Sequence, residues 1–316
     1  MSQPLFADLP KAVLHDHLDG GLRVGTMIEL AAAADYELPT TDPESLADLM
    51  YQGDSGSLVE YLRAFDHTTG VMQTADAIER VAYEAAIDHH NDGVVYAEIR
   101  MAPSLLTARG LSRVEVIAAI LEGLRRASAE SGIITGLIAT AMRSDTDSLE
   151  VAVAASRFVG DGVVGFDIAG PEVGNPVEAH LPAIRYAREA GLGITLHAGE
   201  AGGLDSIAAA VGKGATQRIG HGVRIIDDCK VAGGEIVDLG LLAMRIRDQQ
   251  IPLECAVTSN VHTAIADDVA SHPFGMLYRA GFNVTINTVN KLMCRVTMSS
   301  EFASLVDAAG ISVAGL

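Results

Sequence analysis

The chain has 316 residues, of which 49% are apolar and 4% aromatic, and it contains no Trp. That length suits one large α/β barrel domain whose core is built mainly from aliphatic residues and alanine. The net charge of −19 disfavours nucleic acid and anionic membranes as partners, because both bind basic surfaces.

The cysteines and the N-terminal segment indicate the compartment. Cys229, Cys255 and Cys294 are few, widely spaced and odd in number, so we expect no disulfide framework and a reducing environment. The first 17 residues lack a basic region followed by an apolar one, so no signal peptide is expected. No run of about 18 uncharged apolar residues is present, and none is expected to span a membrane. These features predict a cytoplasmic protein.

Short apolar, β-branched segments alternate along the chain with longer segments rich in Ala and Leu. The first kind predicts strands at 12–17, 94–101, 134–141, 163–168, 193–198, 218–221, 252–258 and 283–289. The second kind predicts helices at 24–35, 75–92, 112–131, 147–158, 176–190, 203–211, 233–249 and 298–309. Strands separated by helices pair in parallel, and eight such units predict a (β/α)8 TIM barrel that forms a single domain over 1–316.

A doubly wound open sheet is the alternative architecture. It would be favoured by a glycine-rich phosphate-binding sequence after the first strand. Residues 18–23 (LDGGLR) do not match the GxGxxG pattern, so this signal is absent.

Residues 37–73 form a longer connection than one strand–helix unit needs. The segment SLVEYLRAFDHTTGVMQ (57–73) has apolar residues on one helical face. Insertions after a barrel strand commonly build part of an active-site lid. The segment is interpreted either as a helical lid or as an extra pair of surface helices.

Two histidines stand at the end of the first predicted strand. His15 and His17 are spaced i, i+2, which places both imidazoles on the inward face of a barrel strand. Two converging imidazoles supply half of a zinc site. A pair of this spacing can also be incidental.

The end of the fifth predicted strand carries His197, followed three residues later by Glu200. A third histidine would complete a tetrahedral zinc site that keeps one open position. Glu200 could shuttle protons if burial raised its pKa. Alternatively, His197 bonds a neighbouring loop and Glu200 compensates the dipole of the helix that follows.

Three further positions complete the pattern. His221 ends the sixth predicted strand, where it could orient or deprotonate a metal-bound water or act as a fourth ligand. Asp167 ends the fourth strand and could anchor neighbouring loops. Gly170 allows a planar ligand close to the backbone, or serves only the turn. Because barrels keep their active sites at the C-terminal ends of the strands, the combined pattern predicts a metal-dependent hydrolase.

At these residues the sequence resembles the adenosine deaminase family of the amidohydrolase superfamily. The resemblance runs in order from about residue 10 to about 310. Its segments are LHDHLDGGLR (14–23), YAEIRMAP (96–103), GFDIAGPE (165–172), LHAGEAGG (196–203) and RIGHGVR (218–224), and the actinobacterial branch is suggested by FDHTTGVMQT (65–74) and NTVNKLMC (287–294).

The resemblance implies a chemistry and a set of roles. His15, His17 and His197 would hold one zinc ion, and a hydroxide generated there would attack C6 of adenosine, giving inosine and ammonia. Glu200 would protonate purine N1, and His221 would assist the water and stabilise developing charge. The implied partner is a small purine nucleoside, for which the substrate-binding residues would be His17, Asp19, Gly170 and Asn290, with Asn290 near purine N7.

One position departs from the family pattern. Where the family has an Asp that ligates zinc and bonds the attacking water, this chain has Val289, which can do neither. We expect zinc binding to weaken by about 10- to 100-fold. We expect turnover to fall by about 100-fold or more, the amount that one positioned acid–base group supplies.

Two other interpretations of the function stay open beside an impaired deaminase. The first is a catalytically inactive barrel that binds a nucleoside. The second is an amidohydrolase that acts on a different purine-type substrate or uses non-hydrolytic chemistry.

Overall fold

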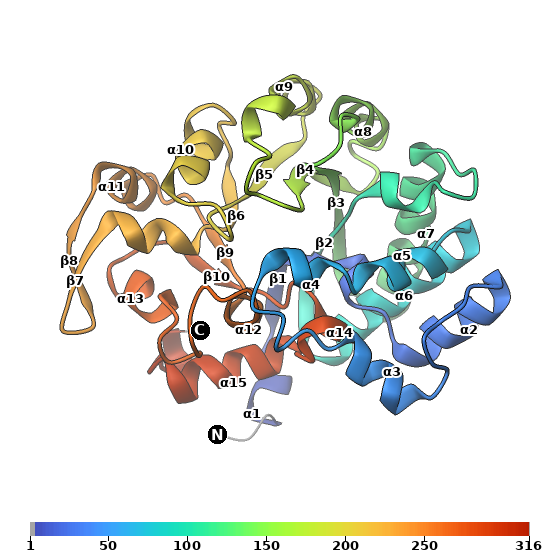
Figure 1. Ribbon diagram of the computed structural model, residues 1–316, viewed down its shortest axis with the longest axis horizontal. Coiled ribbons are helices and arrows are strands. Elements are labelled where there is room, and N and C mark those ends of the chain that lie inside the picture. The colour runs from blue at the N-terminus through green and yellow to red at the C-terminus, as the bar shows by residue number, and fades with distance from the viewer. Residues whose placement is uncertain (1–3, 316) are drawn as a thin grey trace.

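The structure is a computed structural model that describes residues 4–315, and eight parallel strands form its centre (Figure 1). Their spatial order is β1-β2-β3-β4-β5-β6-β9-β10. The strands are β1 (Lys11–His17), β2 (Val94–Met101), β3 (Ile134–Met142), β4 (Val163–Ala169), β5 (Gly193–Ala198), β6 (Arg218–His221), β9 (Leu253–Cys255) and β10 (Val284–Ile286). All neighbouring pairs in this sheet are parallel, as the alternating pattern predicts.

The two ends of the sheet meet beyond β10. A parallel bridge joins Asp16 to Val289. The backbone N–H of His17 donates to the carbonyl of Val289 at 2.7 Å, and the N–H of Val289 donates to the carbonyl of His15 at 3.0 Å. This junction brings the first and last strands together, so the predicted (β/α)8 barrel is confirmed.

Helices surround the strands on the outside (Figure 1). The α-helices are α1 (Pro4–Ala7), α2 (Val24–Ala34), α3 (Pro43–Met50), α4 (Leu58–Leu62), α5 (Phe65–Val71), α6 (Ala75–Asn91), α7 (Arg113–Ser131), α8 (Ser148–Ser156), α9 (Leu181–Glu189), α10 (Leu204–Gly212), α11 (Leu241–Asp248), α12 (Val257–His262), α13 (Phe274–Arg279), α14 (Lys291–Cys294) and α15 (Met298–Ala308). The 3₁₀ turns are η1 (Leu18–Gly20), η2 (Pro103–Leu106), η3 (Val177–His180), η4 (Val223–Asp228) and η5 (Val313–Gly315).

Local sequence signals explain where the longest of these helices begins and ends. Ser112 accepts a hydrogen bond from the backbone N–H of Glu115, whose side chain returns a bond to the Ser112 backbone N–H. This capping box satisfies donors that an α-helix leaves free at its start. The helix ends at Gly132, whose φ of 81° is left-handed and suits glycine.

The predicted helix at 233–249 is wrong in its first half. Residues 229–239 form an antiparallel hairpin of β7 (Cys229–Ala232) and β8 (Glu235–Leu239), and α11 starts only at Leu241. Gly233 and Gly234 have φ values of 61° and 77°. A Gly-Gly pair with positive φ at both positions is a favoured two-residue hairpin turn, and it outweighs the helical periodicity of the flanking residues.

The predicted strand at 252–258 is also too long. Strand β9 ends at Cys255, and α12 begins at Val257. β-branched residues at the start of α12 favoured a strand in the sequence, but the chain has already reached the end of the barrel there.

The long connection at 37–73 contains helices α3, α4 and α5. In Figure 1, α4 and α5 lie in front of the strands rather than in the outer ring. That this insertion acts as a lid remains a prediction.

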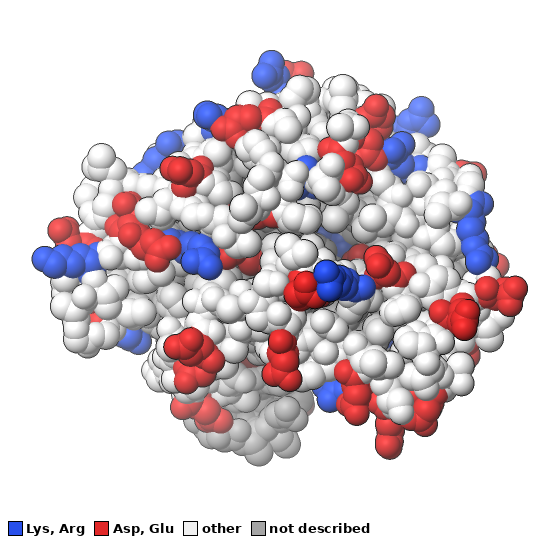
Figure 2. Space-filling model, in the orientation of Figure 1, with Lys and Arg blue, Asp and Glu red and all other residues white. Residues whose placement is uncertain are grey.

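The visible surface carries no gathered basic patch. Figure 2 shows Lys and Arg scattered singly among more numerous Asp and Glu side chains. Across residues 4–315, none of the helices combines the length and the apolarity needed to cross a lipid bilayer.

Candidate active site

A cavity of about 850 Å³ opens at the C-terminal ends of the strands. Helices α4 and α5 contribute apolar side chains to one wall, and loops after the strands contribute the polar groups. The lining residues that the sequence singled out are His17, Asp19, Gly170, His197, Glu200, His221, Val289 and Asn290. The structure therefore brings every predicted site residue to one place, with His15 fully buried beneath the cavity.

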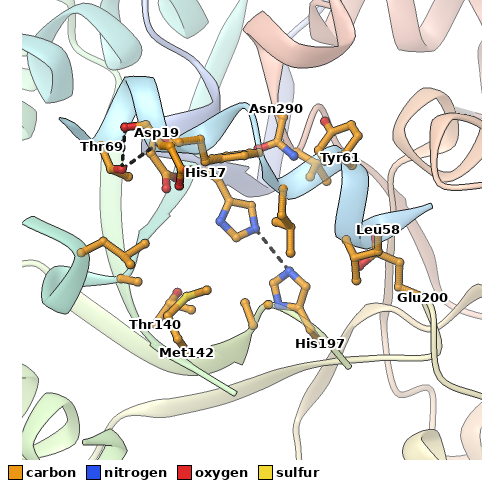
Figure 3. Close-up of a pocket in the computed structure, with 18 of the residues that line it drawn as sticks. His17, Asp19, Leu58, Tyr61, Thr69, Thr140, Met142, His197, Glu200 and Asn290 are labelled. Atoms are coloured by element: carbon orange, nitrogen blue, oxygen red, sulfur yellow. Dashed lines mark hydrogen bonds between the residues drawn. The ribbon is translucent and has the colours of Figure 1, made fainter. Parts of the chain in front are cut away.

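Three imidazoles from β1 and β5 converge at the base of the cavity. The Nε2 atom of His17 lies 3.3 Å from Nε2 of His15 and 3.2 Å from Nε2 of His197. Figure 3 shows His17 and His197 pointing toward each other. Nitrogen ligands about 2.0–2.1 Å from a tetrahedral zinc lie about 3.3 Å apart, so these spacings match a metal site.

Buried carboxylates stand behind two of these rings. Asp167 Oδ2 on β4 lies 2.8 Å from Nδ1 of His197, and Glu254 Oε2 on β9 lies 3.2 Å from Nδ1 of His15. The guanidinium of Arg100 donates to both carboxylates, at 2.9 and 2.7 Å. A carboxylate beside Nδ1 favours the tautomer with its proton there, which leaves Nε2 free as a ligand.

Burial supports the same conclusion. It is the largest cause that lowers the pKa of His15, His17 and His197 well below the usual value, so these rings are neutral at pH 7. A neutral imidazole keeps one nitrogen lone pair, and Nε2 atoms that face each other at 3.2–3.3 Å can either share a hydrogen bond or bind one cation. The donor set, its protonation and its spacing therefore fit a divalent metal ion.

Glu200 lies in the loop after β5 and faces the same cavity. Burial, reinforced by the charge of Glu172, raises the pKa of Glu200 to about 8. Its carboxyl group is therefore largely protonated at neutral pH in the metal-free protein and can donate a proton, which is the state that the sequence prediction required.

The loop that carries Glu200 is fixed by the carboxylate of Glu172. Four consecutive backbone N–H groups, those of residues 199–202, donate to its two oxygens at 2.7 to 3.1 Å. A carboxylate that accepts several backbone N–H bonds is held firmly and in turn holds the loop. Glu172 thus fixes the position of the Glu200 backbone, from which the Glu200 side chain extends into the cavity.

His221 is the last residue of β6 and has a left-handed backbone conformation, with a φ of 63°. Its Nε2 lies 3.6 Å from Glu200 Oε2, and its Nδ1 lies 3.0 Å from the side-chain amide of Asn260 on α12. The ring also contacts those of His15 and His197. His221 is thus next to both the converging imidazoles and the Glu200 carboxyl group.

Three predicted ligand-binding residues line other parts of the cavity wall. Asp19, in η1, has a pKa raised to about 7, mainly by burial. Gly170 follows β4 with φ 94°, a conformation that favours glycine. Asn290 packs directly on Gly20, where any larger residue would collide with the Asn290 amide. Figure 3 shows Asp19 and Asn290 on the same side of the pocket as His17.

Val289 is buried and lines the cavity beside these polar groups. Its φ of 59° is left-handed, which is rare for a β-branched residue and is tolerated far better by Asp or Asn. The backbone therefore keeps a conformation that suits a short polar side chain, while the side chain present is apolar.

Sequence reasoning did not select Arg100, Glu172, Glu254 or Asn260. Arg100 lies with Glu98 in strand β2, and Glu254 is the one charge of strand β9; charged side chains within otherwise apolar strands were the available signal. Glu172 lay inside a matched segment without an assigned role. Asn260 lies two residues past the strand expected at 252–258, on helix α12, which was not expected.

Similar proteins were found in curated collections of sequences. The adenosine deaminase family matches residues 10–316. Adenosine deaminase 1 of Streptomyces coelicolor is 50% identical over 311 residues, which cover 96% of this chain and 78% of that protein. An adenosine deaminase of Mycobacterium sp. (strain JLS) is 48% identical, covering 98% of this chain and 89% of the relative.

Solved structures show the same fold. An adenine deaminase from Arthrobacter aurescens superposes with a TM-score of 0.86 at 27% identity, covering 97% of this chain and 90% of the other. An Arabidopsis N6-mAMP deaminase gives 0.83 at 27% identity, covering 99% and 91%. A Burkholderia ambifaria amidohydrolase with bound Zn gives 0.84 at 24% identity, covering 99% and 84%. The match over nearly the whole sequence establishes that this chain belongs to the adenosine deaminase family.

Proposed function

We propose that this protein catalyses the zinc-dependent hydrolytic deamination of adenosine, in which adenosine and water give inosine and ammonia. One observation carries the proposal. A carboxyl group whose pKa is raised to about 8, Glu200, faces the same cavity as three converging imidazole nitrogens. Hydrolysis at C6 of a purine needs this pair, an activated water and a proton donor for the ring nitrogen.

The proposed zinc ligands are His15, His17 and His197. Their neutral rings and the 3.2–3.3 Å separations between Nε2 atoms support this assignment. Zinc bound there would supply a Lewis acid that lowers the pKa of water to about 7.

The proposed catalytic residues are Glu200 and His221. Glu200 donates its proton to purine N1, which makes C6 more electrophilic, and Glu172 holds it in position through the loop backbone. His221, beside Glu200 and the metal-binding rings, interacts with the water and the charge that develops at C6.

The proposed substrate-binding residues surround these groups. His17 and Asp19 contact the ribose, the backbone N–H of Gly170 donates to the purine edge, and the Asn290 amide bonds purine N7. All four residues line the cavity. We further propose that α4 and α5, which line one wall, act as a lid over the bound purine.

The charges of the cavity favour a nucleoside over a nucleotide. Among the described residues that line it there are three carboxyl groups, Asp19, Asp66 and Glu200, and no Lys or Arg. A 5′-phosphate would find no cationic side chain in this lining to pair with. The uncharged ribose of adenosine needs no such partner.

Val289 sets the expected level of activity. Without the carboxylate, zinc binding is expected to weaken by about 10- to 100-fold, and the attacking water loses an acceptor that would orient it. The catalytically inactive, nucleoside-binding barrel is therefore the second candidate, favoured by this one residue.

The proposed location of the protein is the cytoplasm. The three cysteines are free in the structure, which agrees with a reducing compartment.

Steady-state assays of the purified protein with adenosine, adenine and AMP, together with zinc analysis, test the proposal. We expect adenosine to have the highest kcat/KM and AMP the lowest, with up to one zinc ion per chain. A preference for adenine or AMP would contradict the proposed substrate. Saturable binding of adenosine without turnover, at full zinc occupancy, would instead support the inactive barrel.

A further inference from the structure

A chain of buried hydrogen bonds leads from the backbone of α13 to His221. The N–H of Phe274 lies 3.1 Å from Nδ1 of His272, and Nε2 of His272 lies 3.2 Å from Oδ1 of Asn260. The side-chain nitrogen of Asn260 then lies 3.0 Å from Nδ1 of His221. All three side chains are buried, so water cannot replace these bonds.

The donor and the acceptor of every hydrogen bond in this series follow from the first bond, which the backbone N–H of Phe274 donates. A backbone N–H can only donate, so Nδ1 of His272 must accept and carries no proton. Burial lowers the pKa of His272 to about 3, so this ring is neutral and its one proton is on Nε2. That N–H donates to Oδ1 of Asn260.

The amide of Asn260 is oriented as a result. Its oxygen accepts from His272, so its NH₂ group must face His221 and donate to Nδ1. The opposite amide orientation would direct the NH₂ group at the N–H of His272. The chain therefore excludes that orientation, and Nδ1 of His221 is an acceptor.

We propose that His272 and Asn260 are positioning residues that fix the tautomer of His221, leaving its proton on Nε2. This Nε2–H faces Glu200 Oε2 at 3.6 Å and the cavity. His221 is thereby a hydrogen-bond donor toward the reacting groups, and its Nε2 is not free to remove a proton from water. The catalytic consequence rests on the proposed function, whereas the tautomer does not.

Three helices, α12, α13 and α15, hold the hydrogen-bonded residues Asn260 and His272 in place. Asn260 lies on α12, whose first turn is held by Glu301 of α15 through the backbone N–H and hydroxyl of Thr258. His272 lies just before α13. The assignment therefore depends on tertiary contacts and not on the residues next to His221 in the sequence.

The tautomer can be observed directly by two-bond ¹H–¹⁵N spectra of protein labelled with [¹⁵N]histidine. The signals of His221 are identified by their loss in His221→Gln. In the unaltered protein we expect a protonated Nε2 and a bare Nδ1. In Asn260→Asp, an isosteric change that leaves only acceptors at this position, we expect the proton on Nδ1. Asn91→Asp adds the same charge at an exposed position at the end of α6 and should leave the His221 signals unchanged.

Kinetics supply the second measurement, made in the unaltered protein and in the Val289→Asp background. We expect Asn260→Asp to lower kcat by about 10- to 100-fold, as for other residues that orient a site histidine, with little change in KM. A proton on Nδ1 of His221 in the unaltered protein would overturn the assignment. Unchanged kcat after the tautomer has switched would overturn its catalytic consequence. If no variant turns over adenosine, the proposed function fails, yet the spectrum of the unaltered protein still decides the tautomer.

Discussion

Two residues where the barrel strands end, His221 on β6 and Val289 three residues after β10, share a left-handed φ and have very different side chains. His221 has a φ of 63° and Val289 a φ of 59°, both left-handed. At the end of β6, the imidazole bonds Asn260 and faces Glu200. At the end of β10, an apolar side chain lies among polar groups with nothing to donate or accept.

The comparison shows that barrel closure, rather than the side chain, determines the backbone at residue 289. Its N–H and its carbonyl both bond β1, on either side of Asp16. These bonds persist with Val in place, although a left-handed β-branched residue costs about 1–3 kcal/mol. The backbone at residue 289 therefore has a conformation that suits a short polar side chain such as Asp, although the side chain present cannot bind a metal.

Restoring a carboxylate is expected to remove most of the difference between the two strand ends. Val289→Asp should raise kcat/KM for adenosine by about 100-fold or more, because the water regains an acceptor that orients it. Steady-state rates from the loss of adenosine absorbance measure this change. Equal rates in the two proteins would show that Val289 does not limit the turnover of adenosine.

A matched control separates this effect from added charge. Val237→Asp places the same substitution on the exposed hairpin strand β8, away from the cavity. It should leave kcat/KM unchanged.

Zinc should also stabilise the two proteins to different extents. If Val289→Asp binds zinc about 10- to 100-fold more tightly, saturating zinc stabilises it by about 1.4 to 2.8 kcal/mol more than the unaltered protein. Thermal unfolding with and without zinc measures the difference. The same zinc-dependent rise in Tm for both proteins would mean that residue 289 does not contact the metal.

The smallest expected effect concerns Glu172, which holds the acid that faces His221. Glu172→Gln keeps the size of the side chain but removes a charge that raises the pKa of Glu200 from its usual value. The pKa of Glu200 then falls, and because the protonated form is the active one, the loss of rate with rising pH should move to lower pH. We expect kcat to decrease by about 10-fold, since an amide cannot accept all four backbone N–H bonds.

A pH profile of kcat, compared with that of Glu178→Gln, tests this prediction. Glu178 is a surface residue that pairs with Lys213, so its substitution changes the net charge equally without touching the loop. An unshifted profile in Glu172→Gln would show that Glu172 only supports the fold.

Much of the site could be predicted because its histidines stand at the C-terminal ends of the predicted parallel strands. The parallel arrangement brings the C-terminal ends of β1, β4, β5 and β6 together, so His15, His17, His197 and His221 had to meet once the strands were recognised. The hairpin at 229–239 and helix α12 were missed, since short segments with mixed signals depend on the Gly-Gly turn and on where the barrel ends. Asn260 was missed with them.

The sequence by itself determined the strand–helix alternation, the convergence of four histidines and Glu200 on one face, and the presence of Val289 where the resemblance leads us to expect an Asp. Only the tertiary structure decided the states of these groups. Burial and the Glu172 carboxylate raise the pKa of Glu200. Asp167, Glu254 and Arg100 hold the rings of His197 and His15, and His272 contacts His221 through Asn260. The reason is physical. Residue types and their spacing are local, whereas tautomers, pKa values and the backbone at Val289 depend on neighbours that only barrel closure brings within hydrogen-bonding distance.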